Sequence, residues 1–215
     1  MSEALIHALV FESTGTHRPL SSGEVRAWQP GQGLLWVHLD ATQEQTQEWL
    51  TDTAGLQKIV VSALLAEETR PRSSTIGEGL LLVLRGVNLN PGANPEDMVS
   101  VRLWVEQNRV VSTCRRRLLS VADVVASHGE KPLECAGDLL VRLTDRLTDR
   151  MSDVIDDMDE VVAKLEAAVL YGPDVSMRAD LADLRRDAIA LRRYLGPQRE
   201  ALGRLQAEPL SWLTA

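Results

Sequence analysis

The sequence predicts an α/β protein in which a mixed sheet covered by helices is followed by long antiparallel helices. Residues 1–135 contain short apolar runs, bounded by Gly, Ser or Asp, that alternate with segments of helical pattern. Residues 137–207 instead carry apolar side chains at spacings that alternate between four and three. The 215 residues, 44% of them hydrophobic, leave room for one ordinary domain and an appendage. We therefore divide the chain into an α/β domain at 1–135 and a helical region at 136–215.

The first part of the α/β domain indicates two strands and two helices. The runs "LIHALVF" (5–11) and "GLLWVHLDA" (33–41) are typical of strands. Residues 42–55 predict a helix with Thr42 as its N-cap and Gly55 as its left-handed end. A second helix is expected over Lys58–Glu68.

The second part of the domain indicates three strands. "GEGLLLVLRGVNL" (77–89) has the continuous apolar character of a buried strand, and the turn-rich "NPGANPED" follows it. "VSVRLWVEQNRVVSTCR" (99–115) predicts a hairpin that turns at Gln107–Asn108. Strands interleaved with helices favour a sheet that helices cover.

Two series of apolar residues predict two long amphipathic helices with coiled-coil-like seams, one from Leu140 to Ala168 and one from Met177 to Leu205. Gly172–Pro173 lies between them and predicts the turn that reverses the chain. Pro197 lies inside the second helix, where we expect a kink or a local break. About 30 residues make a helix of roughly 45–50 Å, so both helices should project beyond the domain.

An acidic stripe lies on the first of these helices. At about 100° per residue one face collects five carboxylates, and the apolar residues fall on the opposite side. The stripe consists of Asp149, Asp153, Asp156, Asp157 and Glu160. It is either a solvated helix face or a site for a cation or a basic partner that relieves the like-charge repulsion. Carboxylates without His or Cys suit Mg²⁺ or Ca²⁺ better than Zn²⁺.

The remaining features exclude several classes of function. A net charge of −8 argues against a nucleic-acid partner. His7, His17, His38 and His128 are scattered without metal-ligand spacing, and Cys114 and Cys135 form no disulfide framework. The loop motifs of nucleotide-binding proteins, serine hydrolases and zinc proteases are missing, so we expect neither an enzyme active site nor an organic cofactor. The longest apolar run, Leu80–Leu84, and the N-terminus predict no membrane helix and no signal peptide.

Four stretches, taken in order, resemble the cytoplasmic N-terminal region of the CorA-like divalent-cation transporters, and within them the zinc-transporter (ZntB) branch. They are "SALLAEETRPR" (62–72), the strands "GLLLVLRGVNL" and "VSVRLWVEQNRVVSTCRR", "LTDRMSDVIDDMDEVVAKLE", and "LRRDAIALRRYLGPQREALGRL" (184–205). The residues that match the family's motifs are Glu67, Glu68, Arg70, Pro71, Arg72, Arg192, Arg193, Pro197 and Arg199.

The resemblance implies an α/β/α sandwich with long helices, the last of which runs on as a stalk into a transmembrane segment. It also implies a homopentamer around a central ion path, on the cytoplasmic side of the inner membrane, that handles a divalent cation such as Zn²⁺ or Mg²⁺. The chain stops at Ala215, before the family's membrane helices and pore loop. We therefore expect a soluble cytosolic fragment that meets the membrane only through missing C-terminal segments. The alternative is a soluble cytosolic scaffold or binding protein whose long helices pair with a partner coiled coil.

Overall fold

A seven-stranded mixed sheet forms the centre of the computed structural model, which describes residues 4–12, 16–127, 132–170, 175–205, 210 and 212. The strand order is β2-β1-β3-β7-β6-β5-β4. β3 and β7 pair in parallel, and the other neighbouring strands pair antiparallel. The strands are Leu5–Phe11 (β1), His17–Pro19 (β2), Leu34–Asp40 (β3), Arg72–Ile76 (β4), Gly79–Gly86 (β5), Val99–Glu106 (β6) and Arg109–Cys114 (β7). The predicted mixed sheet is confirmed, and so is the hairpin that turns at Gln107–Asn108.

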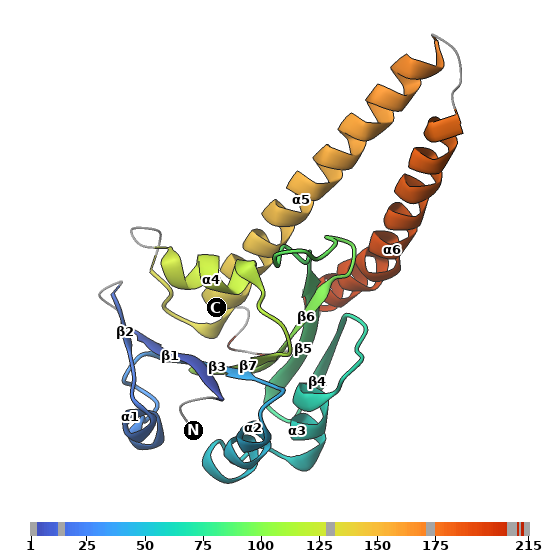
Figure 1. Ribbon diagram of the computed structural model, residues 1–215. Helices are drawn as coiled ribbons and strands as arrows, with labels where there is room; N and C mark the ends of the chain where they lie inside the picture. The colour runs from blue at the N-terminus through green and yellow to red at the C-terminus, as the bar shows by residue number, and fades with distance from the viewer. Residues whose placement is uncertain are drawn as a thin grey trace.

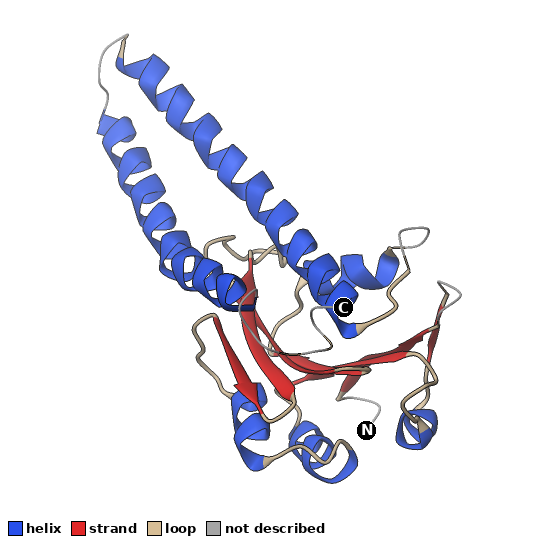
Figure 2. Ribbon diagram, turned by 180° about the vertical axis from the view of Figure 1, so that it is seen from behind, coloured by secondary structure: helices blue, strands red, loops and turns tan. Residues whose placement is uncertain are grey.

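Helices cover both faces of the sheet, which gives the three layers of an α/β/α sandwich (Figure 2). One face carries Ser22–Ala27 (α1), Glu44–Glu48 (α2), the π-helical turn Trp49–Thr53 (η1) and Lys58–Leu65 (α3). The other face carries Leu119–Ala126 (α4) and the beginning of the helical hairpin, which consists of Ala136–Val169 (α5) and Val175–Leu205 (α6). The hairpin projects well beyond the sandwich, as its length predicts (Figure 1).

Two hydrophobic cores explain why the central strands are apolar at every position. Alternate side chains of a strand point to opposite faces, so Leu80, Leu82 and Leu84 pack under α4 and α5. Leu81 belongs to the other core with Trp49 and the rest of the α3 face. Burial on both faces requires a continuous apolar run, and such runs were the strongest strand signal in the sequence.

Two predicted helix boundaries are wrong, the start of α2 and the end of α3. The N-cap of α2 is Gln43, because Thr42 donates its backbone N–H and its hydroxyl to the carboxylate of Asp40 instead. Gly55 is left-handed, with φ of 66°, as predicted. The helix expected over Lys58–Glu68 already ends at Leu65, because the chain turns to an extended conformation at Ala66.

Four short elements were not predicted: β2, α1, β4 and α4. The start of α1 had a readable signal, since Ser21 and Glu24 form a capping box in which each side chain binds the other residue's backbone N–H. β4 and α4 carry no comparable signal in the sequence.

The long helices of the hairpin are the predicted ones, and α6 is continuous through Pro197. No break therefore interrupts it, although Figures 1 and 2 show that the helix changes direction towards the sheet. The predicted turn at Gly172–Pro173 lies outside the described residues. α6 ends at Leu205, and Leu210 is buried in the core between the sheet and α5.

We expect Gly33→Ala to destabilise the fold more than Gly31→Ala, because only one of these glycines meets another strand. Both have positive φ, 101° and 103°, so an alanine at either position costs about 1–2 kcal/mol of unfolding free energy. A Cβ at Gly33 would also lie 2.2 Å from the carbonyl oxygen of Phe11, whereas one at Gly31 would meet nothing within 4 Å. The clash should add about 1–3 kcal/mol. Urea denaturation of both variants measures the difference, and equal losses would contradict this account of β3's start.

Candidate functional site

The acidic stripe lies entirely on the exposed surface of α5. Asp149, Asp153, Asp156, Asp157 and Glu160 are all exposed. On the same helix Asp149 lies 3.4 Å from Arg146 and Glu160 lies 3.4 Å from Lys164. The hydrogen bond to Asp123 raises the pKa of Arg150, and the charge of Asp153 helps to raise it. The carboxylates in the middle of the stripe, Asp153, Asp156 and Asp157, have no ion pair among the described residues.

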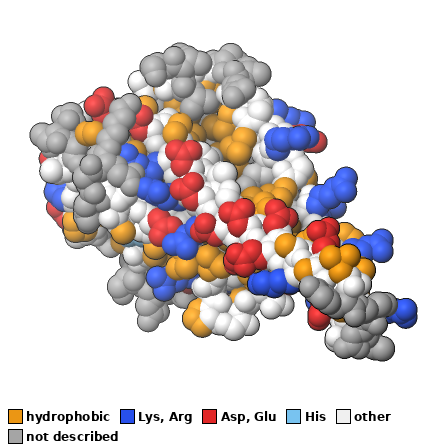
Figure 3. All heavy atoms as spheres, turned by 90° about the horizontal axis from the view of Figure 1, so that it is seen from above, with side chains coloured by type: hydrophobic (Ala, Val, Ile, Leu, Met, Phe, Trp, Pro, Cys, Tyr) orange, Lys and Arg blue, Asp and Glu red, His pale blue; other side chains and the backbone are white. Residues whose placement is uncertain are grey.

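A groove of ≈650 Å³ runs between α5 and α6 beside the stripe. Its floor is apolar and includes Val161 and Leu184, whereas Asp157 of α5 and Asp183 and Asp187 of α6 line it with negative charge. Acidic and hydrophobic side chains consequently lie next to one another on the face seen from above in Figure 3. The groove gives the hairpin a surface that can attract a cation or a complementary helix.

Among the described residues, the buried apolar contacts of α5 with α6 lie near the sheet. There Met151 and Leu191 meet Val87 and Met98 in a third hydrophobic cluster. Farther out apolar side chains of both series line a groove, and Leu181 is 58% exposed. The outer hairpin therefore has few internal contacts that fix the distance between its helices.

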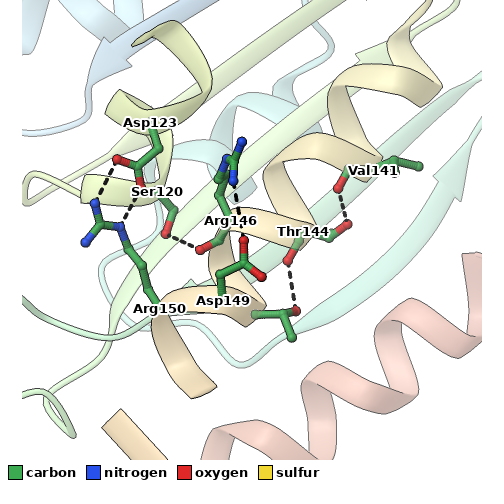
Figure 4. A network of polar contacts seen from close by, with 8 residues as sticks. Ser120, Asp123, Val141, Thr144, Arg146, Asp149 and Arg150 are labelled. Atoms are coloured by element: carbon green, nitrogen blue, oxygen red, sulfur yellow. Dashed lines mark hydrogen bonds and ion pairs between the residues drawn. The ribbon is translucent and has the colours of Figure 1, made fainter. Parts of the chain in front are cut away.

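The base of α5 is fixed to α4 by polar contacts (Figure 4). The guanidinium of Arg150 donates to both carboxylate oxygens of Asp123, with Nη2 2.7 Å from Oδ1. The hydroxyl of Ser120 donates to the backbone oxygen of Arg146 at 3.2 Å. These bonds position the first turns of the stripe relative to the sandwich.

Within the described part of the chain, no group of three or more His, Cys, Asp or Glu side chains is arranged to hold a metal ion. One helix face spreads its carboxylates into solvent, so a tight cation site there needs ligands from a second helix or a second chain. The stripe is thus half of a possible site at most.

The segment that carries Glu67, Glu68 and Arg70 is a loop between α3 and β4, and two arginines of the sheet hold its backbone. Arg102 Nη2 donates to the carbonyl oxygens of Ala66, at 2.5 Å, and Glu67, at 3.2 Å. Arg85 donates from Nε and Nη2 to the carbonyl oxygen of Thr69, at 3.1 and 2.8 Å. These hydrogen bonds fix the loop's backbone to the sheet, while Glu67 and Glu68 stay exposed. Pro71 is buried at its end, and Arg72, the first residue of β4, is exposed.

Arg102 is fully buried, and this is the residue that sequence reasoning missed most clearly. Burial lowers its pKa to about 10, because the charged form loses its hydration. Its Nε and Nη1 atoms have no hydrogen-bond partner among the described residues. An arginine within "VSVRLW" reads as a polar interruption of a strand, and nothing in the sequence indicates that it is buried under a loop.

The C-terminal part of α6 docks on the sheet through residues between its arginines. The ring of Tyr194 lies 4.0 Å from the guanidinium carbon of Arg85. Gln198 is buried, and its Oε1 accepts the backbone N–H of Arg85 at 2.7 Å. The side chains singled out for their match to the family, Arg192, Arg193 and Arg199, are exposed on the same helix, and Pro197 is half-buried.

Two of the four histidines, His7 and His38, lie side by side in the fold. His7 and His38 stack with ring centroids 5.0 Å apart, and His38 Nε2 lies 3.3 Å from the thiol of Cys114. Burial lowers the pKa of His7 to about 4 and that of His38 to about 3, and it raises the pKa of Cys114 to about 12. All three are neutral at neutral pH.

Comparison with known proteins supplies what the geometry alone does not. The model of the family described as "CorA-like Mg2+ transporter protein" matches residues 31–215.

The chain belongs to the CorA-like family. It is 40% identical over 216 residues to "Divalent cation transporter CmaX" of Pseudomonas aeruginosa, which covers 97% of this chain and 64% of that protein. It is 34% identical over 211 residues to "Zinc transport protein ZntB" of Pectobacterium atrosepticum, which covers 97% of this chain and 63% of that protein. The chain thus spans less than two thirds of the length of either relative. The resemblance read from the sequence is confirmed.

Solved structures of the CorA-like family have the same fold. The full-length CmaX protein superposes with a TM-score of 0.90 at 36% identity, over 98% of this chain and 66% of that one. The ZntB cytoplasmic domain from Vibrio parahaemolyticus gives a TM-score of 0.84 at 23% identity, over 98% and 82% of the two chains, which is a likeness of fold alone. In the residues described here, no helix is both long enough and apolar enough to cross a membrane.

The buried histidines predict a loss of stability in mild acid. The unfolded chain takes up protons on His near pH 6.5, whereas folded His7 and His38 do so only near pH 4 and 3. Between pH 6.5 and 4 the unfolded state therefore binds more protons than the folded state. As the pH falls through this range, each histidine lowers the unfolding free energy by about 1.4 kcal/mol per pH unit.

His7→Phe keeps an aromatic ring and removes one of these two protonation sites. As the pH falls, the unfolding free energy of the variant should therefore decrease less steeply than that of wild type, by about 1.4 kcal/mol per pH unit. Urea unfolding of both proteins at pH 7, 6 and 5 measures the two slopes. Parallel slopes would show that His7 titrates normally in the folded chain.

Proposed function

We propose that this chain is the cytoplasmic funnel and regulatory part of a homopentameric transporter of divalent cations. The observation that carries the proposal is the identity of 40% with a protein named as a divalent cation transporter, along 97% of the chain. In this proposal residues 1–135 form the α/β/α domain, and 136–215 form the helical hairpin and the start of a stalk. The stalk leads to the inner membrane through segments beyond Ala215.

The charge of the hairpin supports a cation-handling role. Asp153, Asp156 and Asp157 are exposed and make no ion pair among the described residues, although the charge of Asp153 acts on nearby Arg150. Repeating such a helix around a ring would multiply the negative potential and concentrate cations near the ion path. We propose that cations bind this stripe at the boundary between neighbouring copies, where a second chain completes the ligand set.

The chemistry of the stripe favours Mg²⁺ over Zn²⁺. Its ligands are carboxylates without His or Cys, and hard cations prefer oxygen donors. Zinc transport, which the name of one relative states, would then depend on residues outside the stripe.

The stripe is tested by changing Asp153, Asp156 and Asp157 together to Asn. Bound cation should stabilise wild type, by about 2.7 kcal/mol at a hundredfold excess over the dissociation constant, and the triple variant should lose this gain. Without metal the variant should be more stable than wild type, by on the order of 1–2.5 kcal/mol for about five relieved like-charge pairs. The measurement is the melting temperature against Mg²⁺ or Zn²⁺ concentration at constant ionic strength.

A matched control changes three exposed acids on the opposite side of the sandwich, Glu44→Gln, Glu48→Gln and Asp52→Asn. This variant should keep the full response to the cation. If wild type and the stripe variant respond alike, the stripe is a solvated helix face. Sedimentation velocity in the same titration reports whether the cation also joins copies of the chain, as a site between chains requires.

A further inference from the structure

The sheet has a topological switch point between β3 and β7. These two strands are adjacent and parallel, and they end together at Asp40 and Cys114. The chain leaves β3 towards α2 and η1 on one face, and it leaves β7 towards α4 on the other face (Figure 2). Connections that diverge in this way leave a crevice at the carboxyl ends of the strands, where ligands of open α/β sheets bind.

A cavity of ≈610 Å³ occupies this position. Asp40 and Cys114 line it at the strand ends, and Val121, Ala122 and Val125 of α4 form an apolar wall. The volume falls within the roughly 300–1,000 Å³ of small-molecule sites. The cavity therefore has the size and the apolar lining that a small organic ligand requires.

The polar groups around the cavity favour an anion. Arg115, Arg116 and Arg117 line it, against the single carboxylate of Asp40. Glu67 pairs with Arg115 and Asp97 pairs with Arg116, whereas Arg117 has no ion pair within the described residues. Asp40 is already engaged, because its Oδ1 accepts the N–H and hydroxyl of Thr42.

The start of α4 adds a positive potential at the cavity, because Leu118 both lines the cavity and is the N-cap of this helix. Leu118 provides no side-chain hydrogen bond to the first turn, so the positive end of the helix is open to an acceptor.

We propose that this cavity binds a small organic anion. Its charged group lies at Arg117 and the start of α4, and its apolar body lies along Val121, Ala122 and Val125. The site is separate from the acidic stripe, so it does not depend on the proposed cation function.

The test uses two fluorescent probes with similar apolar bodies, of which one carries a charge. 8-Anilinonaphthalene-1-sulfonate is an anion, and N-phenyl-1-naphthylamine is its neutral counterpart. Wild type should bind the anionic probe more tightly. Arg117→Gln should weaken the anionic probe about tenfold and leave the neutral probe unchanged. Ala122→Trp fills the cavity beside α4 and should weaken both probes.

Arg178→Gln is the matched control, since it removes the same charge from an exposed position on α6. It should change neither isotherm. The proposal is overturned if Arg117→Gln binds the anionic probe as wild type does, or if a folded Ala122→Trp protein keeps both affinities. Circular dichroism confirms folding, and because Arg117 is exposed, its variant decides the question even if Ala122→Trp fails to fold.

Discussion

The arrangement of this chain depends on Arg85, which joins three segments that are far apart in the sequence. Its guanidinium donates to the carbonyl oxygens of Thr69 and Met98, and its backbone N–H donates to Gln198. The same guanidinium stacks on Tyr194. β4 pairs with β5 only as far as Val83, so no residue of β4 lies opposite Arg85. The side chain of Gln198 accepts the backbone N–H of Arg85 instead. One residue of the sheet thus holds both the loop between α3 and β4 (66–71) and the long helix α6.

This constraint divides the hairpin into a fixed base and a free outer part. Arg85 holds α6 at the sheet, and Arg150 with Asp123 holds α5 to α4. Beyond the cluster around Met151 a groove lies between the two helices, and Asp156 and Asp157 lie on that outer part. A hairpin that is fixed at its base and carries, on its outer part, acids without ion pairs among the described residues is suited to respond to a cation or to a neighbouring chain. Burial of the guanidinium lowers the pKa of Arg85, and the carbonyl oxygens and the Tyr194 ring offset part of the lost hydration.

The sequence predicted the elements that obey a strong hydrophobic period and missed those that depend on distant contacts. The continuous apolar run around Leu82 predicted a strand buried on both faces, and the apolar series that ends at Leu205 predicted a helix. The end of α3 was misplaced because Arg102, more than thirty residues away, binds the carbonyl of Ala66 and turns the chain. The meeting of His7 and His38 follows from the register of β1 with β3, which no local pattern contains.

Arg85 couples the loop between α3 and β4 to α6, and amide hydrogen exchange of Arg85→Lys tests this coupling most directly. Lysine keeps the charge but lacks the planar guanidinium that reaches Thr69 and Met98 together and stacks on the ring of Tyr194 in α6. We expect faster exchange in both 66–72 and 184–205, with the central strands unchanged. Arg192→Lys, at an exposed position of α6, should change neither segment. If the loop exchanges faster while α6 keeps its wild-type protection, the two segments are held independently and the account is contradicted.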